Sequence, residues 1–158
     1  MTQRIDYPRL APDAMKTMMT LERYVRGSEL EHSLIELVKL RASYMNGCAY
    51  CVDMHSKDAR IAGESEQRIY AVPVWRETPF FTPRERAALA WTESVTDLGG
   101  ADGSDELYEE ARTHFSELEL VNLTMAVIAI NGWNRLAVSF RSEPGIYQPA
   151  ALAAGASN

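Results

Sequence analysis

Helix-start signals recur along this chain, and no stretch shows the alternation of apolar and polar residues that a half-buried strand requires. Three capping boxes, each a Ser or Thr followed three residues later by Glu, stand ahead of or within apolar-periodic stretches. They are Ser28 with Glu31, Thr82 with Glu85, and Ser116 with Glu119. In a capping box the hydroxyl and the carboxylate accept hydrogen bonds from amides that a helix start leaves unpaired. The pattern therefore predicts an all-α fold.

Glycines mark the ends of the expected helices, because glycine readily takes the left-handed conformation that closes a helix. Such glycines stand at 27, 47, 63 and 99–100. The sequence predicts seven helices, at residues 11–26, 29–46, 48–62, 65–72, 82–97, 104–114 and 116–140. The segment 73–81 holds two prolines and three aromatic residues, and we expect it to be a packed loop that covers the bundle.

The length of 158 residues fits one domain. A domain of this size buries about 68–70% of its unfolded surface, so a core can form without structural disulfides. We expect a single helical domain over residues 1–142, with residues 143–158 as a mobile or subunit-docking tail. Residues 120–130 are apolar on nearly all sides, which indicates either the central helix of the bundle or an oligomer interface.

The charge balance argues against two classes of partner. The net charge is −6 with a pI of about 5.1, whereas nucleic acids and anionic membranes are bound mainly through clustered Lys and Arg. The sequence also shows neither a secretory apolar region at its start nor an apolar run that could span a bilayer. We therefore expect a cytoplasmic protein that binds no nucleic acid and no membrane.

Two cysteines carry the clearest chemical signal. In the cytoplasm thiols stay reduced, so Cys48 and Cys51 indicate redox, catalytic or metal-binding chemistry rather than a structural staple. Because Gly47 can close the preceding helix, Cys48 should begin the next one. On that helix Cys48, Cys51 and His55 lie within about 60° of one another. Helix-start amides and an adjacent imidazolium favour the thiolate over an ordinary cysteine, whose pKa is about 8.5.

Two charged residues of the preceding helix need partners. Glu36 lies at the margin of the apolar arc of residues 29–46, where most carboxylates are solvated. If Glu36 turns inward, it could orient His55 as a third group orients a catalytic base. Arg41 falls inside the apolar arc and should be paired. We expect an ion pair across a subunit interface, with Glu36 as the alternative partner.

The order Glu36, then Asn46-Gly-Cys-Ala-Tyr-Cys51, then His55 resembles the core of the alkyl hydroperoxidase D / carboxymuconolactone decarboxylase-like family. The resemblance is most specific over residues 33–62 and extends more loosely to Arg135. It implies an all-α bundle of the alkyl hydroperoxidase D-like type, often assembled as a homo-oligomer, a trimer or hexamer.

The resemblance also implies an activity, the reduction of small hydroperoxides by a dithiol, thioredoxin-like or lipoyl electron donor. Cys51 would attack the peroxide and become a sulfenic acid, and Cys48 would then form a disulfide with it. Glu36 and His55 would form the proton relay. Tyr50 stands where the best-known members carry a second His. Members named for the decarboxylase generally lack the cysteine pair, which counts against that reaction here.

Two alternatives remain open at this point. Zinc could be bound by Cys48, Cys51, His55 and Glu36, since Zn²⁺ accepts S, N and O ligands, although structural sites favour sets richer in Cys or His. The cysteine pair could instead exchange disulfides or sense oxidation without peroxide turnover. The preferred interpretation, a thiol hydroperoxidase, requires no cofactor and no metal.

The remaining histidines and tryptophans have simpler expected roles. His32 and His114 stand among charged residues and should lie at the surface, and Trp91 should pack in the core. Trp133 should also pack in the core. With its neighbours Asn131, Asn134 and Arg135, it is in addition a candidate wall of the thiol pocket.

Overall fold

The computed structural model describes residues 2–99 and 104–149, and within these ranges it contains helices and no strand. The elements are α1 (Tyr7–Leu10), α2 (Pro12–Arg26), α3 (His32–Met45), α4 (Ala49–Ile61), α5 (Glu66–Ala71), the 3₁₀ helix η1 (Val72–Glu77), α6 (Pro83–Thr96), α7 (Asp105–His114) and α8 (Glu117–Phe140). The all-α prediction is confirmed, and each of the seven predicted helices is present with its ends moved by three residues or fewer. The short α1 and η1 were not predicted.

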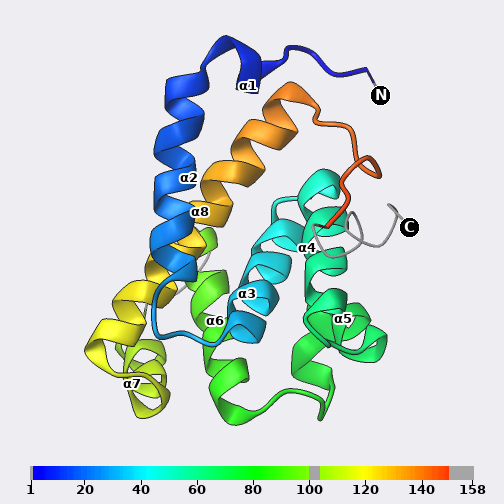
Figure 1. The fold of residues 1–158 in the computed structure, drawn as a ribbon. Helices are drawn as coiled ribbons and strands as arrows, with labels where there is room; N and C mark the ends of the chain where they lie inside the picture. The colour runs from blue at the N-terminus through cyan, green and yellow to red at the C-terminus, as the bar shows by residue number, and fades with distance from the viewer. Residues whose placement is uncertain (1, 100–103, 150–158) are drawn as a thin grey trace.

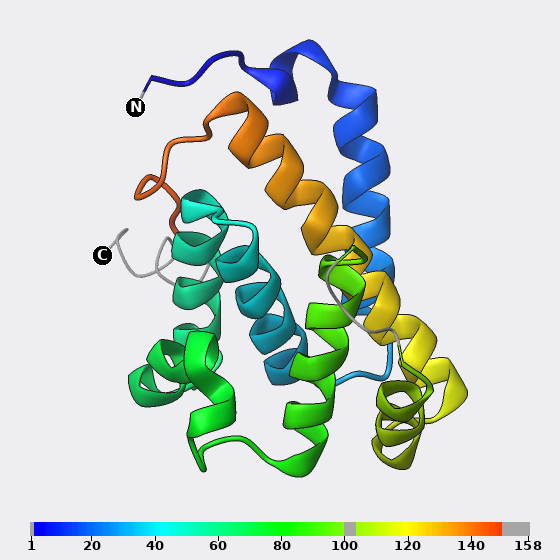
Figure 2. The same ribbon diagram turned by 180° about the vertical axis from the view of Figure 1, so that it is seen from behind.

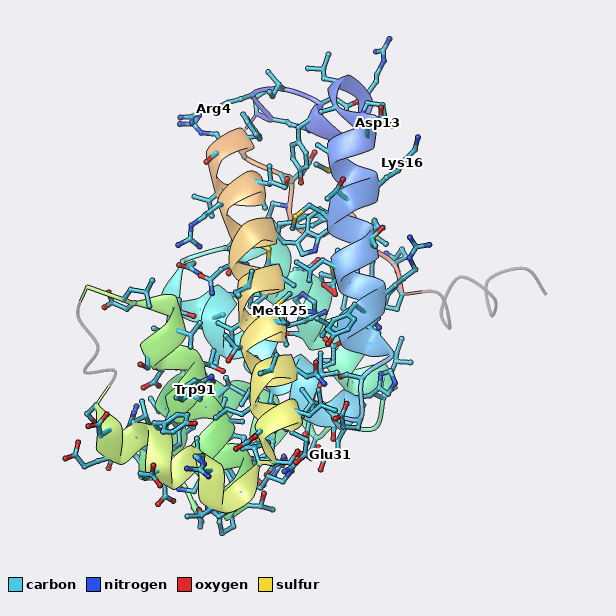
Figure 3. All side chains as sticks on the ribbon, turned by 90° about the vertical axis from the view of Figure 1, so that its left-hand side faces the viewer. Arg4, Asp13, Lys16, Glu31, Trp91 and Met125 are labelled. Atoms are coloured by element: carbon cyan, nitrogen blue, oxygen red, sulfur yellow. A yellow bond between two sulfur atoms is a disulfide. The ribbon has the colours of Figure 1, made fainter. Side chains whose placement is uncertain are left out.

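Helix α3 occupies the middle of the bundle and packs against α4, α6 and α8 (Figure 1). Seen from behind, α4 and α6 lie on either side of α3, and α7 lies at the lower end of α8 (Figure 2). Helix α2 lies alongside α8 (Figure 3). The middle of α8 is fully buried at Leu123, Val127 and Ile130, as expected of a central helix, whereas Val121 and Ile128 are exposed.

Two of the three capping boxes form as predicted. Thr82 and Ser116 each accept a hydrogen bond from the third residue of the helix that follows, and the Glu there accepts one in return. The capping box predicted at Ser28 does not form, so that prediction is wrong. The Ser28 hydroxyl donates to the Val25 carbonyl at 2.7 Å, and α3 starts only after Glu31, with no side-chain cap. Ser28 thus satisfies the end of α2 instead of the start of α3.

The segment predicted as a loop is partly helical. Residues 72–77 form η1, and Pro73 is compatible with its first turn because that position needs no amide hydrogen. Trp75 is only 4% exposed and belongs to the core around Leu37 and Leu89. Residues 73–81 thus pack on the bundle as predicted, but only the residues after Glu77 form a loop.

Arg41 finds its partner within the chain. Its Nε donates to Glu93 of α6 at 2.8 Å, and its Nη1 donates to the Pro73 carbonyl at 3.1 Å. Trp75 Nε1 donates to the same Glu93 oxygen at 2.7 Å. The sequence predicted a partner across a subunit interface or, failing that, Glu36. Neither is the partner here, because α6 packs on α3 and brings a carboxylate to the guanidinium.

The chain after α8 returns to α4, as the orange-red segment of Figure 1 shows. The Lys57 ammonium donates to the Tyr147 carbonyl at 3.0 Å, the Gly145 amide donates to Asp53 at 3.1 Å, and the Tyr147 hydroxyl donates to Asp58 at 2.8 Å. The first residues of the predicted tail are therefore bound to α4 of their own chain. Its remainder, 150–158, lies outside the described residues.

No helix within residues 2–99 and 104–149 combines the length and the apolar character needed to cross a bilayer.

Candidate functional site

The two cysteines lie at the start of α4. Gly47 ends the preceding turn with φ of 63°, in the left-handed region that favours glycine. Cys48 is the N-cap residue, and its Sγ accepts a hydrogen bond from the Cys51 amide at 3.3 Å. A disulfide joins Cys48 to Cys51. Both residues are buried, with exposed fractions of 1% and 3%.

His55 lies on the same face of α4, one turn after Cys51, and is buried. Its Nδ1 is 2.8 Å from Oε2 of Glu36, which projects from α3 and is also buried. Glu36 therefore turns inward, and the alternative of a solvated edge charge is wrong. The four predicted site residues meet where α4 packs on α3.

The Glu36 carboxylate lies in a positively polarised setting. Burial by itself raises the pKa of Glu36, but the hydrogen bond with His55 and the charges of His55, Lys39 and Arg26 outweigh it and hold that pKa below its ordinary value. The Arg26 guanidinium lies 3.5 Å from Oε1. Glu36 is thus an anion at neutral pH and can hold the imidazole in one orientation.

A cavity of about 440 Å³ opens beside this cluster. Cys51 and His55 line it, and Cys48 does not. Its other walls are mainly apolar and come from α1, α2, α4, α8 and the segment after α8. Of the four residues predicted as a wall, Trp133 lines this cavity. Asn134 lies deeper, where its amide donates to Ser43 at 3.1 Å.

Asn131 and Arg135 lie elsewhere on α8, on a separate hollow of about 400 Å³ beside Leu98 and Ile128. The Arg135 guanidinium donates to the Asn131 side-chain oxygen at 2.8 Å. The prediction that these two residues wall the thiol pocket is wrong, because a helix with 3.6 residues per turn directs them away from the face of Trp133.

Tyr50, at the position of the family's second His, also lines the cavity. Burial, with smaller contributions from Tyr7 and Asp53, raises the pKa of the Tyr50 hydroxyl. This hydroxyl stays protonated at neutral pH. It can donate a hydrogen bond in the cavity but cannot serve as the base that an imidazole would provide.

The sequence reasoning missed two residues next to this site. Asp58 lies one turn beyond His55 on the same face of α4, so helical spacing could have identified it. Tyr147, whose hydroxyl donates to Asp58, gives no comparable signal because it arrives from the far end of the chain. Burial and Asp58 raise the pKa of Tyr147 to about 12. Both residues line the cavity.

A buried ion pair was also missed. Lys39 is fully buried, and its Nζ lies 2.8 and 2.7 Å from the two carboxylate oxygens of Glu22 on α2. A lysine between Val38 and Leu40 in the apolar stretch of α3 was the available signal, since Lys is almost never fully buried without a partner.

The donor set for a metal differs from the one expected. Ligand atoms of Glu36, His55 and Asp58 lie within 4.8 Å of one another, so these three could hold a cation. The zinc alternative also required thiolates from Cys48 and Cys51, which are joined in a disulfide here and supply thiolates only when reduced.

The sequence model of the carboxymuconolactone decarboxylase family matches residues 12–94, which include all four predicted site residues. The chain belongs to the carboxymuconolactone decarboxylase family. The uncharacterized protein YdfG of Bacillus subtilis is 44% identical over 139 residues, covering 88% of this chain and 95% of YdfG.

Solved structures share the fold. A crystal structure from Agrobacterium tumefaciens, described as a protein of unknown function and a candidate AhpD antioxidant-defence protein, is 49% identical. It has a TM-score of 0.89 and covers 92% of this chain and 100% of its own. A peroxidase-related protein from Ralstonia eutropha with an AhpD core has a TM-score of 0.78 at 20% identity, covering 88% of this chain and 74% of its own. That likeness shows the fold alone.

Proposed function

We propose that this protein reduces organic hydroperoxides through the Cys48–Cys51 pair. The observation that carries the proposal is the placement of Cys51. Its side chain lines the cavity one turn from His55, while Cys48 lies behind it at bonding distance and outside the cavity wall. A reactant in the cavity therefore meets Cys51 first.

In the oxidising step the Cys51 thiolate attacks the distal oxygen of a hydroperoxide, ROOH. A sulfur–oxygen bond forms and the oxygen–oxygen bond breaks, which leaves Cys51 as a sulfenic acid. The departing alkoxide takes a proton and leaves as ROH. His55, one turn from Cys51 and also in the cavity wall, is the proton donor and acceptor of this scheme, and it receives the proton of the Cys51 thiol.

In the resolving step the Cys48 sulfur attacks the Cys51 sulfenic acid. The disulfide forms, the sulfur–oxygen bond breaks, and the hydroxyl leaves with a proton as water. An external dithiol donor, such as a thioredoxin-like or lipoyl group, then reduces the disulfide and is itself oxidised to a disulfide. The sum is ROOH and a dithiol converted to ROH, water and a disulfide.

Glu36 supports His55 in this scheme. Its ionised carboxylate accepts the Nδ1 hydrogen, so that Nε2 is the nitrogen left for proton exchange in the cavity. Glu36 is a positioning residue here, because it acts on the reactants only through the imidazole.

Mass spectrometry of the reduced protein before and after one equivalent of cumene hydroperoxide tests the proposal. We expect the loss of two hydrogen atoms per chain as the disulfide forms, and sustained peroxide consumption when a dithiol is supplied. A Cys51→Ser variant that consumed peroxide at the rate of the unmodified protein would overturn the proposal.

Disulfide exchange with a protein is the competing function of the same pair. Disulfide exchange requires a sulfur that a bulky partner can reach. Cys48 and Cys51 are both almost completely buried, and Cys51 is reached through a cavity. A small reactant fits this geometry better. Catalytic turnover with peroxide, rather than a single oxidation, distinguishes a peroxidase from a redox sensor.

We also propose a cytoplasmic location and assembly as a homo-oligomer, a trimer or hexamer, as the family resemblance implies. Sedimentation equilibrium of the purified protein measures the second of these directly. A mass of 17.7 kDa, that of a single chain, at micromolar concentration would contradict it.

A further inference from the structure

Two arginines line the otherwise mainly apolar cavity. Arg23 and Arg26 lie one turn apart on α2, and both contribute to the cavity wall. Arg26 is engaged at the inner end, where its guanidinium contacts Glu36 at 3.5 Å. Arg23 is exposed, and its Nη2 donates to the Thr20 hydroxyl at 3.0 Å. Within residues 2–99 and 104–149 no carboxylate forms an ion pair with Arg23.

The carboxylates of the cavity wall are already occupied. Glu22 binds Lys39 through both of its oxygens, and Asp58 accepts the hydrogen bond of the Tyr147 hydroxyl. Neither forms an ion pair with Arg23. Arg23 therefore places a positive charge on the α2 side of the cavity, and no carboxylate within residues 2–99 and 104–149 forms an ion pair with it.

Much of the cavity wall is apolar. Met15 and Met19 of α2, Met54 of α4 and Trp133 of α8 contribute to it. Methionine and tryptophan side chains bind bulky hydrocarbon groups well, because thioethers adapt their shape and the indole offers a large flat face. The cavity is thus suited to a molecule with an apolar body and an anionic group.

We infer that the substrate class is an organic hydroperoxide that also carries a carboxylate. This inference rests on the proposed function and specifies its substrate. The peroxide group meets Cys51, the hydrocarbon body lies on the methionines and Trp133, and the carboxylate pairs with Arg23. A guanidinium binds a carboxylate through two parallel N–H···O bonds, which gives the interaction direction as well as charge.

The kinetic test compares cumene hydroperoxide with its para-carboxylate and with the methyl ester of that acid. We expect kcat/KM to be higher for the carboxylate by up to roughly fivefold, as an ion pair of about 1 kcal/mol with the exposed Arg23 would give. This preference should fall with ionic strength. Arg23→Gln should abolish the preference for the carboxylate. Arg112→Gln on α7, outside the cavity wall, is the control and should preserve both this preference and the rate with cumene hydroperoxide.

Equal kcat/KM values for the acid and its ester, or a preference that survives in Arg23→Gln, would overturn the inference. Calorimetric binding of 4-isopropylbenzoate and of the neutral 4-isopropylbenzyl alcohol separates this result from failure of the proposed function. Tighter binding of the anion that is lost in Arg23→Gln supports the carboxylate site even if no hydroperoxide is turned over. Equal binding of the two compounds contradicts the site even if peroxidase activity is found.

Discussion

Oε2 of Glu36 and Nδ1 of His55 lie 2.8 Å apart across the contact between α3 and α4, although 19 residues separate them in sequence. Both groups are buried, so water does not compete for this hydrogen bond. The pair directs the other ring nitrogen away from α3. Because His55 and Cys51 line the same cavity, the proposed relay would end beside the sulfur that a reactant meets.

Replacing Cys51 and replacing Cys48 should stop the reaction with peroxide at different steps. Cys51→Ser removes the sulfur that lines the cavity, so we expect no peroxide consumption above background. Cys48→Ser keeps that sulfur but removes its partner, so one equivalent of peroxide should be consumed and the reaction should then stop at the sulfenic acid. Stopped-flow kinetics and a gain of one oxygen atom per chain in the mass spectrum measure this. The opposite assignment of the two phenotypes would exchange the proposed roles.

Loss of the imidazole should change the pH dependence of the reaction. His55→Gln removes the group that exchanges protons with Cys51, so we expect a fall of about 10²- to 10⁴-fold in the rate of oxidation at neutral pH. The loss should shrink at alkaline pH, where the thiol ionises without help. Glu36→Gln should have a smaller effect of the same kind. A uniform loss at every pH would instead indicate a structural role.

Glu36 should also link folding to pH. Its pKa in the folded protein lies below the ordinary value of 4.5, so its ionised form stabilises the fold above that pH. This contribution is lost as the pH falls from 4.5 through the folded-state pKa. The destabilisation caused by Glu36→Gln should therefore be large at pH 7 and smaller at about pH 3 in urea unfolding. Glu109→Gln, at an exposed position, is the control, and a pH-independent effect of Glu36→Gln would refute the linkage.

The buried pair of Lys39 and Glu22 should show strong coupling. Lys39→Met leaves the Glu22 carboxylate without its partner, which costs about 3–5 kcal/mol for a buried pair. In the Lys39→Met variant, the further change Glu22→Gln should cost much less free energy of unfolding than it does in the unmodified protein. A double-mutant cycle from urea unfolding measures this coupling. Additive losses would mean that the two groups are solvated independently.

The helix caps offer a stability test with an internal control. Thr82→Ala and Ser116→Ala each remove a hydroxyl that accepts a helix-start amide, so each should cost about 1 kcal/mol in the free energy of unfolding. Ser33→Ala changes an exposed serine in the first turn of α3, where no side-chain cap is formed. It should cost nothing measurable. An equal loss in all three variants would show that the caps do not account for the effect.

Features that depend on a few neighbouring residues could be predicted from the sequence. The helices and the shared face of Cys48, Cys51 and His55 follow from hydrogen bonds between residues three or four positions apart, a distance over which the sequence itself sets the geometry. The same local reasoning was wrong at Ser28. Ser28 and Thr82 are both followed three residues later by Glu, but α3 begins later than this pattern predicts. The Ser28 hydroxyl instead donates a hydrogen bond to a carbonyl at the end of α2.

The partners across helices were decided only by the tertiary structure. Whether Glu36 meets solvent or His55, whether Arg41 pairs with Glu93, and which sulfur lines a cavity all depend on how α3, α4 and α6 rotate against one another. That rotation results from the packing of many apolar side chains far apart in the sequence. The chain thus encodes its reactive turn locally, whereas the surroundings that make this turn a site arise from the packed bundle as a whole.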